Sequence, residues 1–205
     1  MRQFGVKQAA VVGLAAMAAI TIPFAVQAQS STTIGRADLK PLNGSHASGQ
    51  VELRLSSDMK TLTVIIQARG LEPGGVHLSH IHGLSDNGQS VDSTCPTSAE
   101  DSDHDGYVEL AEGQVKYGPI LVDFMNIDPD KNGTVNFKKT FDISGSQSAL
   151  PLQMRHVVVH GMTVGAVGAG TPGEVDGTAG FKTVLPVLCG DIRVASLDPL
   201  KFRQP

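Results

Sequence analysis

Residues 51–68 read VELRLSSDMKTLTVIIQA, and this stretch decides the fold class. Apolar and charged residues alternate from Val51 to Leu55, and a largely apolar run, LTVIIQA, extends from Leu62 to Ala68. Alternation with a period of two places one set of side chains on each face of a strand. Ser56-Ser57-Asp58, between the two runs, is typical of a turn. The stretch therefore predicts a β-hairpin.

Six further segments alternate or run apolar over strand-like lengths between turn residues, and we expect a strand in each. No connection between them carries a long amphipathic helical pattern, so the strands should pair antiparallel. The predicted fold class is all-β, an antiparallel sandwich or barrel. The segments span residues 76–82, 120–124, 134–141, 156–160, 181–187 and 192–196.

Two long connections interrupt this series of strands. Residues 83–119 form a polar, acidic excursion, and residues 161–180 are rich in glycine and nearly free of charge. Loops of this length in a compact domain are usually functional. The second connection contains Gly168-x-Gly170-x-x-Gly173, which has the letters of a dinucleotide-binding motif. Because no helix pattern follows it, we interpret this match as accidental.

The N-terminus has the features of a secretory signal peptide over residues 1–28. A positively charged start precedes an apolar run from Ala9 to Ile22, and Val26-Gln27-Ala28 is suited to cleavage. The run is shorter than the ~20 residues that a membrane span requires; an uncleaved N-terminal anchor is the alternative. We expect residues 29–205 to form one domain, periplasmic or secreted, without a membrane span after cleavage.

Composition limits the partners and the redox state. The net charge is −4 and no block of Lys or Arg occurs, which argues against nucleic acid as a partner. Cys95 and Cys189 are the two cysteines, and in an exported chain the default interpretation is an intramolecular disulfide. Two free thiols, or one thiol used as a metal ligand, are the alternatives.

Residues 101–112 (DSDHDGYVELAE) match a twelve-residue EF-hand-type calcium loop. Hard oxygen ligands at this spacing suit Ca²⁺, and a glycine permits the sharp turn at the sixth position. Pro96, Gly113 and Pro119 argue against paired flanking helices, so we expect a calcium loop grafted onto a β scaffold; a solvated acidic loop is the alternative. The predicted ligands are Asp101, Asp103, Asp105, Tyr107 through its carbonyl, Glu109 and Glu112.

A second stretch, residues 128–136 (DPDKNGTVN), fits the first nine positions of the same loop. Its twelfth position is Lys139, which cannot coordinate a cation. Either a carboxylate from elsewhere completes this site, or the segment is a turn with the calcium-loop conformation. The candidate ligands are Asp128, Asp130, Asn132, Thr134 and Asn136.

Five of the seven histidines fall into two short segments. His77, His80 and His82 lie within six residues, and His156 and His160 share a later predicted strand. Because side chains at even spacing on a strand point to the same face, His80 and His82 can approach one ion, and the later pair shares a face. Imidazole clusters suit copper or zinc. We predict a metal site here; structural histidines are the alternative.

These segments resemble a known family. Residues 75–83 (GVHLSHIHG) resemble the G-x-H-x-x-H-x-H segment of copper/zinc superoxide dismutases, and residues 155–160 (RHVVVH) resemble its later R-x-x-V-V-H strand. Cys95 and Cys189-Gly190 resemble the family's disulfide cysteines, and the order agrees across residues 37–196. Residues 39–55, with the pattern Gly49-x-Val51-x-Leu53, and the His80-Ile81-His82 core also resemble chordin-type CHRD domains, which are similar to the dismutase sandwich but are not established enzymes.

The resemblance implies a Greek-key sandwich or barrel of the dismutase type, with long loops that carry the calcium sites. It implies that His80, His82 and His160 are copper ligands, and that His77 packs with its ring tied to nearby backbone. It also implies a disulfide between Cys95 and Cys189.

The chain departs from the family in three places. The stretch that would carry the zinc ligands holds one histidine, His104, inside the calcium loop, so we expect no zinc. Pro186 stands where the family has its catalytic arginine, and Lys182 is the nearest cationic substitute. His156 has no counterpart: it is either a fourth copper ligand or a buried strand histidine.

The expected function is that of an exported, copper-binding, superoxide dismutase-like protein with a calcium-stabilised loop, acting on superoxide. Two alternatives stay open. One is a non-enzymatic CHRD-type module that binds calcium or another metal ion. The other is a protein that sequesters copper without turnover.

Overall fold

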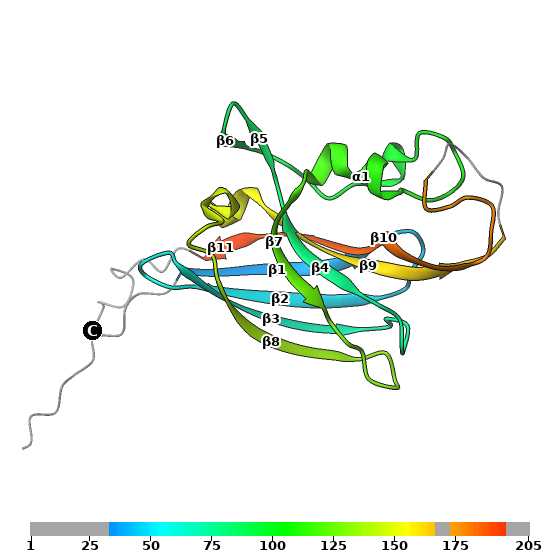
Figure 1. Cartoon of the computed structure of the whole chain (residues 1–205), viewed down its shortest axis with the longest axis horizontal. Helices are drawn as coiled ribbons and strands as arrows, with labels where there is room; N and C mark the ends of the chain where they lie inside the picture. The colour runs from blue at the N-terminus through cyan, green and yellow to red at the C-terminus, as the bar shows by residue number, and fades with distance from the viewer. Residues whose placement is uncertain (1–32, 167–172, 196–205) are drawn as a thin grey trace, which may run out of the picture.

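The computed structural model describes residues 33–166 and 173–195, so the predicted signal peptide and the first two glycines of the Gly168 motif lie outside the described residues (Figure 1). Most of the elements are strands. They are β1 (Thr33–Pro41), β2 (Ser48–Leu55), β3 (Thr61–Arg69), β4 (Leu78–His82), β5 (Leu84–Asp86), β6 (Gln89–Val91), β7 (Ile120–Asn126), β8 (Val135–Asp142), β9 (His156–Val164), β10 (Gly180–Asp191) and β11 (Arg193–Ala195). One α-helix, α1 (Leu110–Tyr117), and three 3₁₀ turns (Ser98–Glu100, Gln147–Ala149 and Leu152–Met154) complete the described elements.

The strands form one curled antiparallel sheet in the order β7-β4-β9-β10-β1-β2-β3-β8, with β11 beside β1 and a separate β5-β6 hairpin (Figure 1). The β1–β10 pair, with Lys40 opposite Cys189, joins the two halves of the sheet. Phe124 on β7 and Phe141 on β8 pack with ring centroids 5.4 Å apart, which brings the two edge strands together. The prediction of an all-β antiparallel fold is confirmed.

The hairpin predicted from residues 51–68 is the β2–β3 pair. Val51, Leu53 and Leu55 are buried on one face of β2, and the intervening charged residues are not. They lie opposite Ile66, Val64 and Leu62 of β3 and form the core with residues of both halves of the sheet. Period-two alternation therefore determines which face of each strand enters the core.

The excursion predicted as a loop contains a helix that the sequence analysis missed. Helix α1 begins at Leu110, within the predicted calcium loop, and a capping box between Glu109 and Glu112 starts it. It buries only Gly113 and Tyr117, while Val115 is exposed. The sequence therefore lacks the apolar stripe from which an amphipathic helix is predicted. Gly113 is required at its position because a Cβ there would lie 2.6 Å from the Tyr117 ring.

The excursion covers the outer face of β4, β9 and β10 (Figure 1). Tyr117 packs there against Val158 and Cys189, with Leu42 and Cys95 at the margin of this small cluster. The outer face is thus buried although it faces away from the main core. Within the described residues, no helix is long and apolar enough to cross a membrane.

Candidate metal centre

Two adjacent strands of the curled sheet supply the histidines of the candidate centre. His80 and His82 lie on β4, and His160 lies on the neighbouring strand β9. Ile81 on β4 and Val159 on β9 are direct chain neighbours of these histidines, and both point into the main core. Because successive side chains on a strand point to opposite faces, the three histidines point to the outer face beneath the excursion. The structure therefore brings together the three side chains predicted to share a site.

Three ring nitrogens converge at this place. His80 Nδ1, His82 Nε2 and His160 Nε2 are buried, and none has a hydrogen-bond partner. Each of the three histidines offers one ligand nitrogen, and these nitrogens all lie within 4.8 Å of one another. The ring centroids are 5.2 to 5.8 Å apart. Because buried polar atoms normally have partners, three orphaned nitrogens aimed at one point fit a bound metal ion.

The other nitrogen of each ring has a neighbour that fixes the ring's orientation. His82 Nδ1 lies 2.8 Å from the Gly118 carbonyl, and His160 Nδ1 lies 2.7 Å from the Val184 carbonyl. Since a carbonyl can only accept, these nitrogens carry the hydrogens and the inner nitrogens keep free lone pairs. His80 Nε2 lies 3.5 Å from Asp123 Oδ1. This is the arrangement by which proteins orient metal-binding histidines.

Sequence reasoning did not find these supporting groups. Asp123 lies in a predicted strand, but its position beside His80 depends on the β4–β7 register. The two carbonyls belong to Gly118 and Val184, where side-chain chemistry gives no signal. A short period-two pattern contains no information about which strand pairs with which.

The environment keeps the three imidazoles neutral. Burial lowers the pKa of His82 to about 4 and that of His160 to about 3. Burial also lowers the pKa of His80, although the Asp123 carboxylate acts in the opposite direction. A histidine must be neutral to bind a metal ion through a ring nitrogen, so the site is prepared for an ion at neutral pH.

His77 does not join the cluster. Its Nδ1 lies 3.1 Å from the carbonyl of His160, and its Nε2 lies 3.0 Å from the carbonyl of Glu72. The ring also meets the edge of Phe181 at a centroid distance of 5.9 Å. His77 thus has its ring tied to nearby backbone, in the way that the sequence analysis expected.

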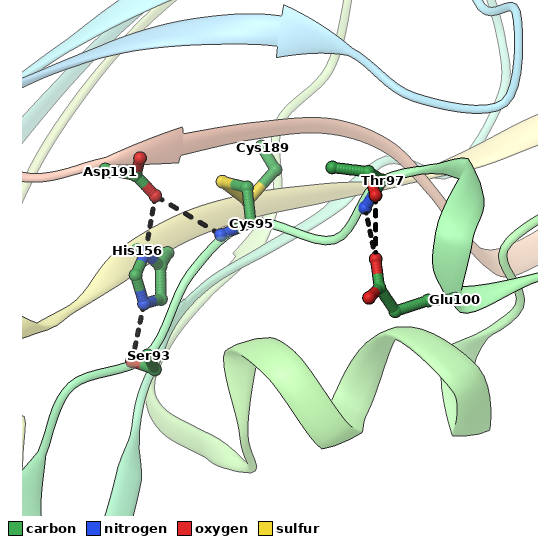
Figure 2. The surroundings of a disulfide bond; sticks show 7 residues. All are labelled: Ser93, Cys95, Thr97, Glu100, His156, Cys189 and Asp191. Atoms are coloured by element: carbon green, nitrogen blue, oxygen red, sulfur yellow. Dashed lines mark hydrogen bonds and ion pairs between the residues drawn. A yellow bond between two sulfur atoms is a disulfide. The ribbon is translucent and has the colours of Figure 1, made fainter.

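His156 is held elsewhere on the same face. Its Nε2 lies 2.5 Å from Ser93 Oγ, and its Nδ1 lies 2.9 Å from Asp191 Oδ1 (Figure 2). Both ring nitrogens are therefore occupied, which matches the buried strand histidine rather than a fourth ligand. His104 is exposed, and it does not belong to the group of histidines whose ligand nitrogens converge.

The cation expected near the centre is neutralised by an ion pair. Lys182 Nζ lies 2.7 Å from Asp176 Oδ1 and 3.3 Å from Thr178 Oγ1. This ammonium group holds the pKa of Asp176 well below its usual range. Pro186 lies opposite His160 in the β9–β10 register, where it offers neither charge nor a backbone N–H.

The predicted disulfide is present. Cys95 in the excursion is bonded to Cys189 on β10, with a Cα–Cα distance of 5.8 Å (Figure 2). The backbone N–H of Cys95 also donates to Asp191 Oδ1. The excursion is therefore tied to the sheet beside His156. The alternatives of two free thiols or a thiolate ligand are wrong.

The acidic residues of the predicted calcium loop come together in two overlapping groups. Ligand oxygens of Asp101, Asp103 and Glu112 lie within 4.8 Å of one another, and so do those of Asp103, Asp105 and Glu109. Asp101 Oδ1 and Asp105 Oδ2 are buried and have no hydrogen-bond partner. The five carboxylate side chains of the prediction thus surround one small region.

Charge accumulates in this loop. Burial raises the pKa of Asp105, and the neighbouring carboxylates of Asp103 and Asp101 raise it further. Burial also raises the pKa of Glu109, to which Glu174 and Asp105 add. Carboxylates that are difficult to ionise together are relieved by a cation among them.

The second candidate loop has a different character. Asp130 Oδ1 accepts hydrogen bonds from the backbone N–H groups of Asn132 and Thr134, at 2.8 and 2.9 Å. The Asp128 carboxylate accepts a hydrogen bond from Asn126 Nδ2, and Asn136 lies within β8. These bonds are those of a turn closed by an aspartate, and no converging carboxylate group within the described ranges includes residues 128–136.

A comparison with models of known protein families found no match for this chain. A comparison with curated proteins found no significant match either. The relationship to dismutases or CHRD domains therefore stays a prediction that rests on the residues.

Proposed function

We propose that this protein is an exported, superoxide dismutase-like copper protein that binds one copper ion through His80, His82 and His160. The observation that carries the proposal is the convergence of three buried, unpartnered ring nitrogens. The opposite nitrogens of His82 and His160 are hydrogen-bonded to carbonyls, and that of His80 lies beside Asp123. Nitrogen ligands of this kind suit copper, which also stands highest in the usual order of divalent affinities. The residues that would hold zinc in the family are missing.

The strand order supports the dismutase-type Greek-key sandwich that the resemblance implies. One half of the sheet has the order β1-β2-β3-β8 and the other has β7-β4-β9-β10. The chain passes between the halves after β3, after β7 and again after β8. Connections of this kind between nonadjacent antiparallel strands are typical of Greek-key folds.

Bound copper would supply one-electron chemistry, oxidising one superoxide to dioxygen and reducing the next, with two protons, to hydrogen peroxide. The chain's own residues would prepare the site. The Gly118 and Val184 carbonyls fix the ring planes of His82 and His160, and the Tyr117 ring covers His82 at a centroid distance of 4.8 Å. His80 Nε2 lies 3.5 Å from Asp123 Oδ1, and the side chain of Asp123 is 51% exposed to solvent.

We expect turnover to be slow. Superoxide is an anion, and steering by nearby cations raises the rate of encounter by about tenfold or more. Here Pro186 replaces the guiding arginine, and the charge of Lys182 is compensated by Asp176. Lys182 is therefore a weak substitute, and Lys182→Ala should reduce the activity only slightly.

The loop of residues 101–112 is proposed to bind one Ca²⁺ through Asp101, Asp103, Asp105, the Tyr107 carbonyl, Glu109 and Glu112. Two buried carboxylate oxygens without partners support this proposal. The ion would compensate the repulsion among five carboxylates and stabilise a long excursion. Residues 128–136 are proposed to be a turn rather than a second calcium site.

Copper sequestration without turnover is the second candidate function. It is favoured by the burial of the histidines, which are between 2% and 5% exposed. A substrate must reach the ion for inner-sphere reaction, whereas storage requires only ligands. The two functions share the same ligands and differ in access.

The decisive experiment is a copper titration of the purified protein, monitored by electron paramagnetic resonance, with superoxide turnover measured on the same samples. We expect one Cu(II) per chain with nitrogen couplings, loss of this copper in His82→Ala and His160→Ala, and retention in the control His104→Ala. Stoichiometric copper without turnover above buffer would leave sequestration. No copper would overturn the proposal and favour a calcium-stabilised CHRD-type module.

A further inference from the structure

Helix α1 physically connects the calcium loop to the histidine cluster. Its first residue, Leu110, belongs to the loop, and its last residue, Tyr117, contacts His82. The helix has only eight residues, and the hydroxyl of Tyr117 donates to the Leu110 carbonyl at 3.2 Å. One side chain thus spans the helix from the loop to the metal ligand.

At the loop end, the carboxylate of Glu112 has two tasks. Its Oε1 accepts from the backbone N–H and the hydroxyl of Ser102, both at 2.7 Å, and its Oε2 accepts from the backbone N–H of Glu109 at 3.1 Å. Glu112 therefore closes the loop and caps the first turn of the helix. Independently of these bonds, the buried oxygens Asp101 Oδ1 and Asp105 Oδ2 have no hydrogen-bond partner, which fits oxygens that bind a cation.

At the cluster end, the residue that ends the helix holds a metal ligand. Gly118 caps α1 by donating its N–H to the Gln114 carbonyl, and its own carbonyl accepts from His82 Nδ1 at 2.8 Å. The fully buried Tyr117 ring lies against the His82 ring at an interplanar angle of 67°. The orientation of His82 thus depends on where the helix ends.

A second connection reaches β10, the strand that pairs with β9. Asn43 Nδ2 donates to the carbonyls of Val108 and Pro186, each at 2.9 Å, and Asn43 Oδ1 accepts from the Val108 N–H at 2.7 Å. Val108 is the eighth residue of the calcium loop, and Pro186 lies opposite His160. The loop is therefore joined to β10, which pairs with the strand of His160, as well as to His82 through α1.

We propose that a calcium ion in the 101–112 loop controls how tightly the three histidines hold copper, with α1 and Asn43 as the connections. The inference rests on the proposed copper site and adds its regulation. Without the ion, mutual repulsion of the carboxylates loosens the loop and the first turn of α1. The Gly118 carbonyl and the Tyr117 ring then no longer fix His82, so the ligands must be ordered when copper binds.

The chemistry of the loop defines the effector. Its proposed ligands are carboxylate oxygens and a carbonyl, which suits Ca²⁺ with six to eight oxygens rather than Mg²⁺ with its strict octahedron. Coupling between two sites is reciprocal and is typically about 5- to 150-fold in affinity. Copper should therefore raise the affinity for Ca²⁺ by the same factor.

The test measures copper affinity by competition with a chromophoric Cu(I) chelator that does not bind calcium, with and without millimolar Ca²⁺, using the intact disulfide-bonded protein. We expect Ca²⁺ to raise the copper affinity of the wild type about 5- to 150-fold, and Mg²⁺ to have little effect. Glu112→Gln should bind copper but lose the response to Ca²⁺. Asp128→Asn, the same chemical change in the second loop, should keep it.

Calorimetric titration of Ca²⁺ into the copper-free and copper-loaded proteins checks the reciprocal effect. Tyr117→Phe, which keeps the ring but removes the bond to Leu110, should bind Ca²⁺ normally and show a smaller coupling. Copper and calcium that both bind but ignore each other would overturn this inference and leave the proposed function intact. No calcium binding would also overturn it, and no copper binding would instead show that the proposed function had failed.

Discussion

Gly161 follows His160 and allows the chain to pass close to the segment before β4. Its φ is +101°, a conformation that residues with a Cβ rarely adopt. A Cβ at this position would lie 2.3 Å from the Val76 carbonyl and 3.3 Å from His77 Nδ1. The carbonyl of His160, the residue before Gly161, lies 3.1 Å from His77 Nδ1. The close approach at Gly161 therefore also sets the position of the metal ligand His160.

Replacement of Gly161 by alanine should destabilise the fold by about 1–3 kcal/mol, because backbone strain and the clash with Val76 act together. The measurement is equilibrium unfolding in denaturant. Gly165→Ala is the matched control, since a Cβ there meets nothing within 4 Å, and its effect should stay within about 0.5 kcal/mol. Equal stability of the two variants would contradict the assignment.

Among the elements, the excursion is held to the sheet by several separate contacts. Its anchors include the Cys95–Cys189 bond, the Tyr117 cluster, the hydrogen bond between Ser93 and His156, and the hydrogen bond from the Cys95 N–H to Asp191 (Figure 2). The disulfide closes a sequence separation of 94 residues. A loop of that length loses much conformational freedom in the unfolded state when it is closed.

Removal of the disulfide in the Cys95→Ser/Cys189→Ser double variant should therefore lower the free energy of unfolding by about 2–5 kcal/mol. The far-ultraviolet circular dichroism of the strands should change little, because the main core does not contain either cysteine. Denaturant unfolding of the oxidised wild type and of the variant provides the comparison. A variant as stable as the wild type would show that the excursion is held by other contacts.

The sequence predicted the elements whose periodicity is strong and missed those that depend on a partner. The β2–β3 hairpin follows from alternation, whereas α1 buries a single large side chain and has no helical stripe. β1 was not predicted as a strand because its polar residues outnumber its buried ones. Strand bounds shifted by a few residues, as at β4, which begins at Leu78 rather than residue 76.

The candidate site divides in the same way. His80, His82 and His160 could be chosen from their spacing and from the family resemblance. The fate of His156 depended on Ser93 and Asp191, which are 63 and 35 residues away in the chain. Lys182 was chosen from the sequence as a cation near the copper site. Its charge is compensated by an ion pair with Asp176, which the sequence does not reveal.

For the whole molecule, the histidine cluster makes the stability of the copper-free protein depend on pH. Burial holds the pKa of His82 at about 4 and that of His160 at about 3, whereas unfolded histidine has a pKa of about 6.5. Between these values the unfolded state binds more protons than the folded state. The stabilising effect is therefore present above pH ~6.5 and is lost as the pH falls toward about 4.

We expect the free energy of unfolding of the copper-free protein to decrease on acidification from about pH 6.5 to pH 4, with His82 alone contributing about 3 kcal/mol. Urea unfolding at a series of pH values measures this slope. His82→Gln should reduce the slope because one buried titrating group is gone. His46→Asn, at an exposed position whose φ of 56° asparagine tolerates, should keep the slope.

Copper should protect the wild type over this range, because an ion on the ring nitrogens excludes protons from them. Identical slopes for wild type and His82→Gln would mean that His82 is not buried as a neutral imidazole, and the argument for the metal centre would fail with it.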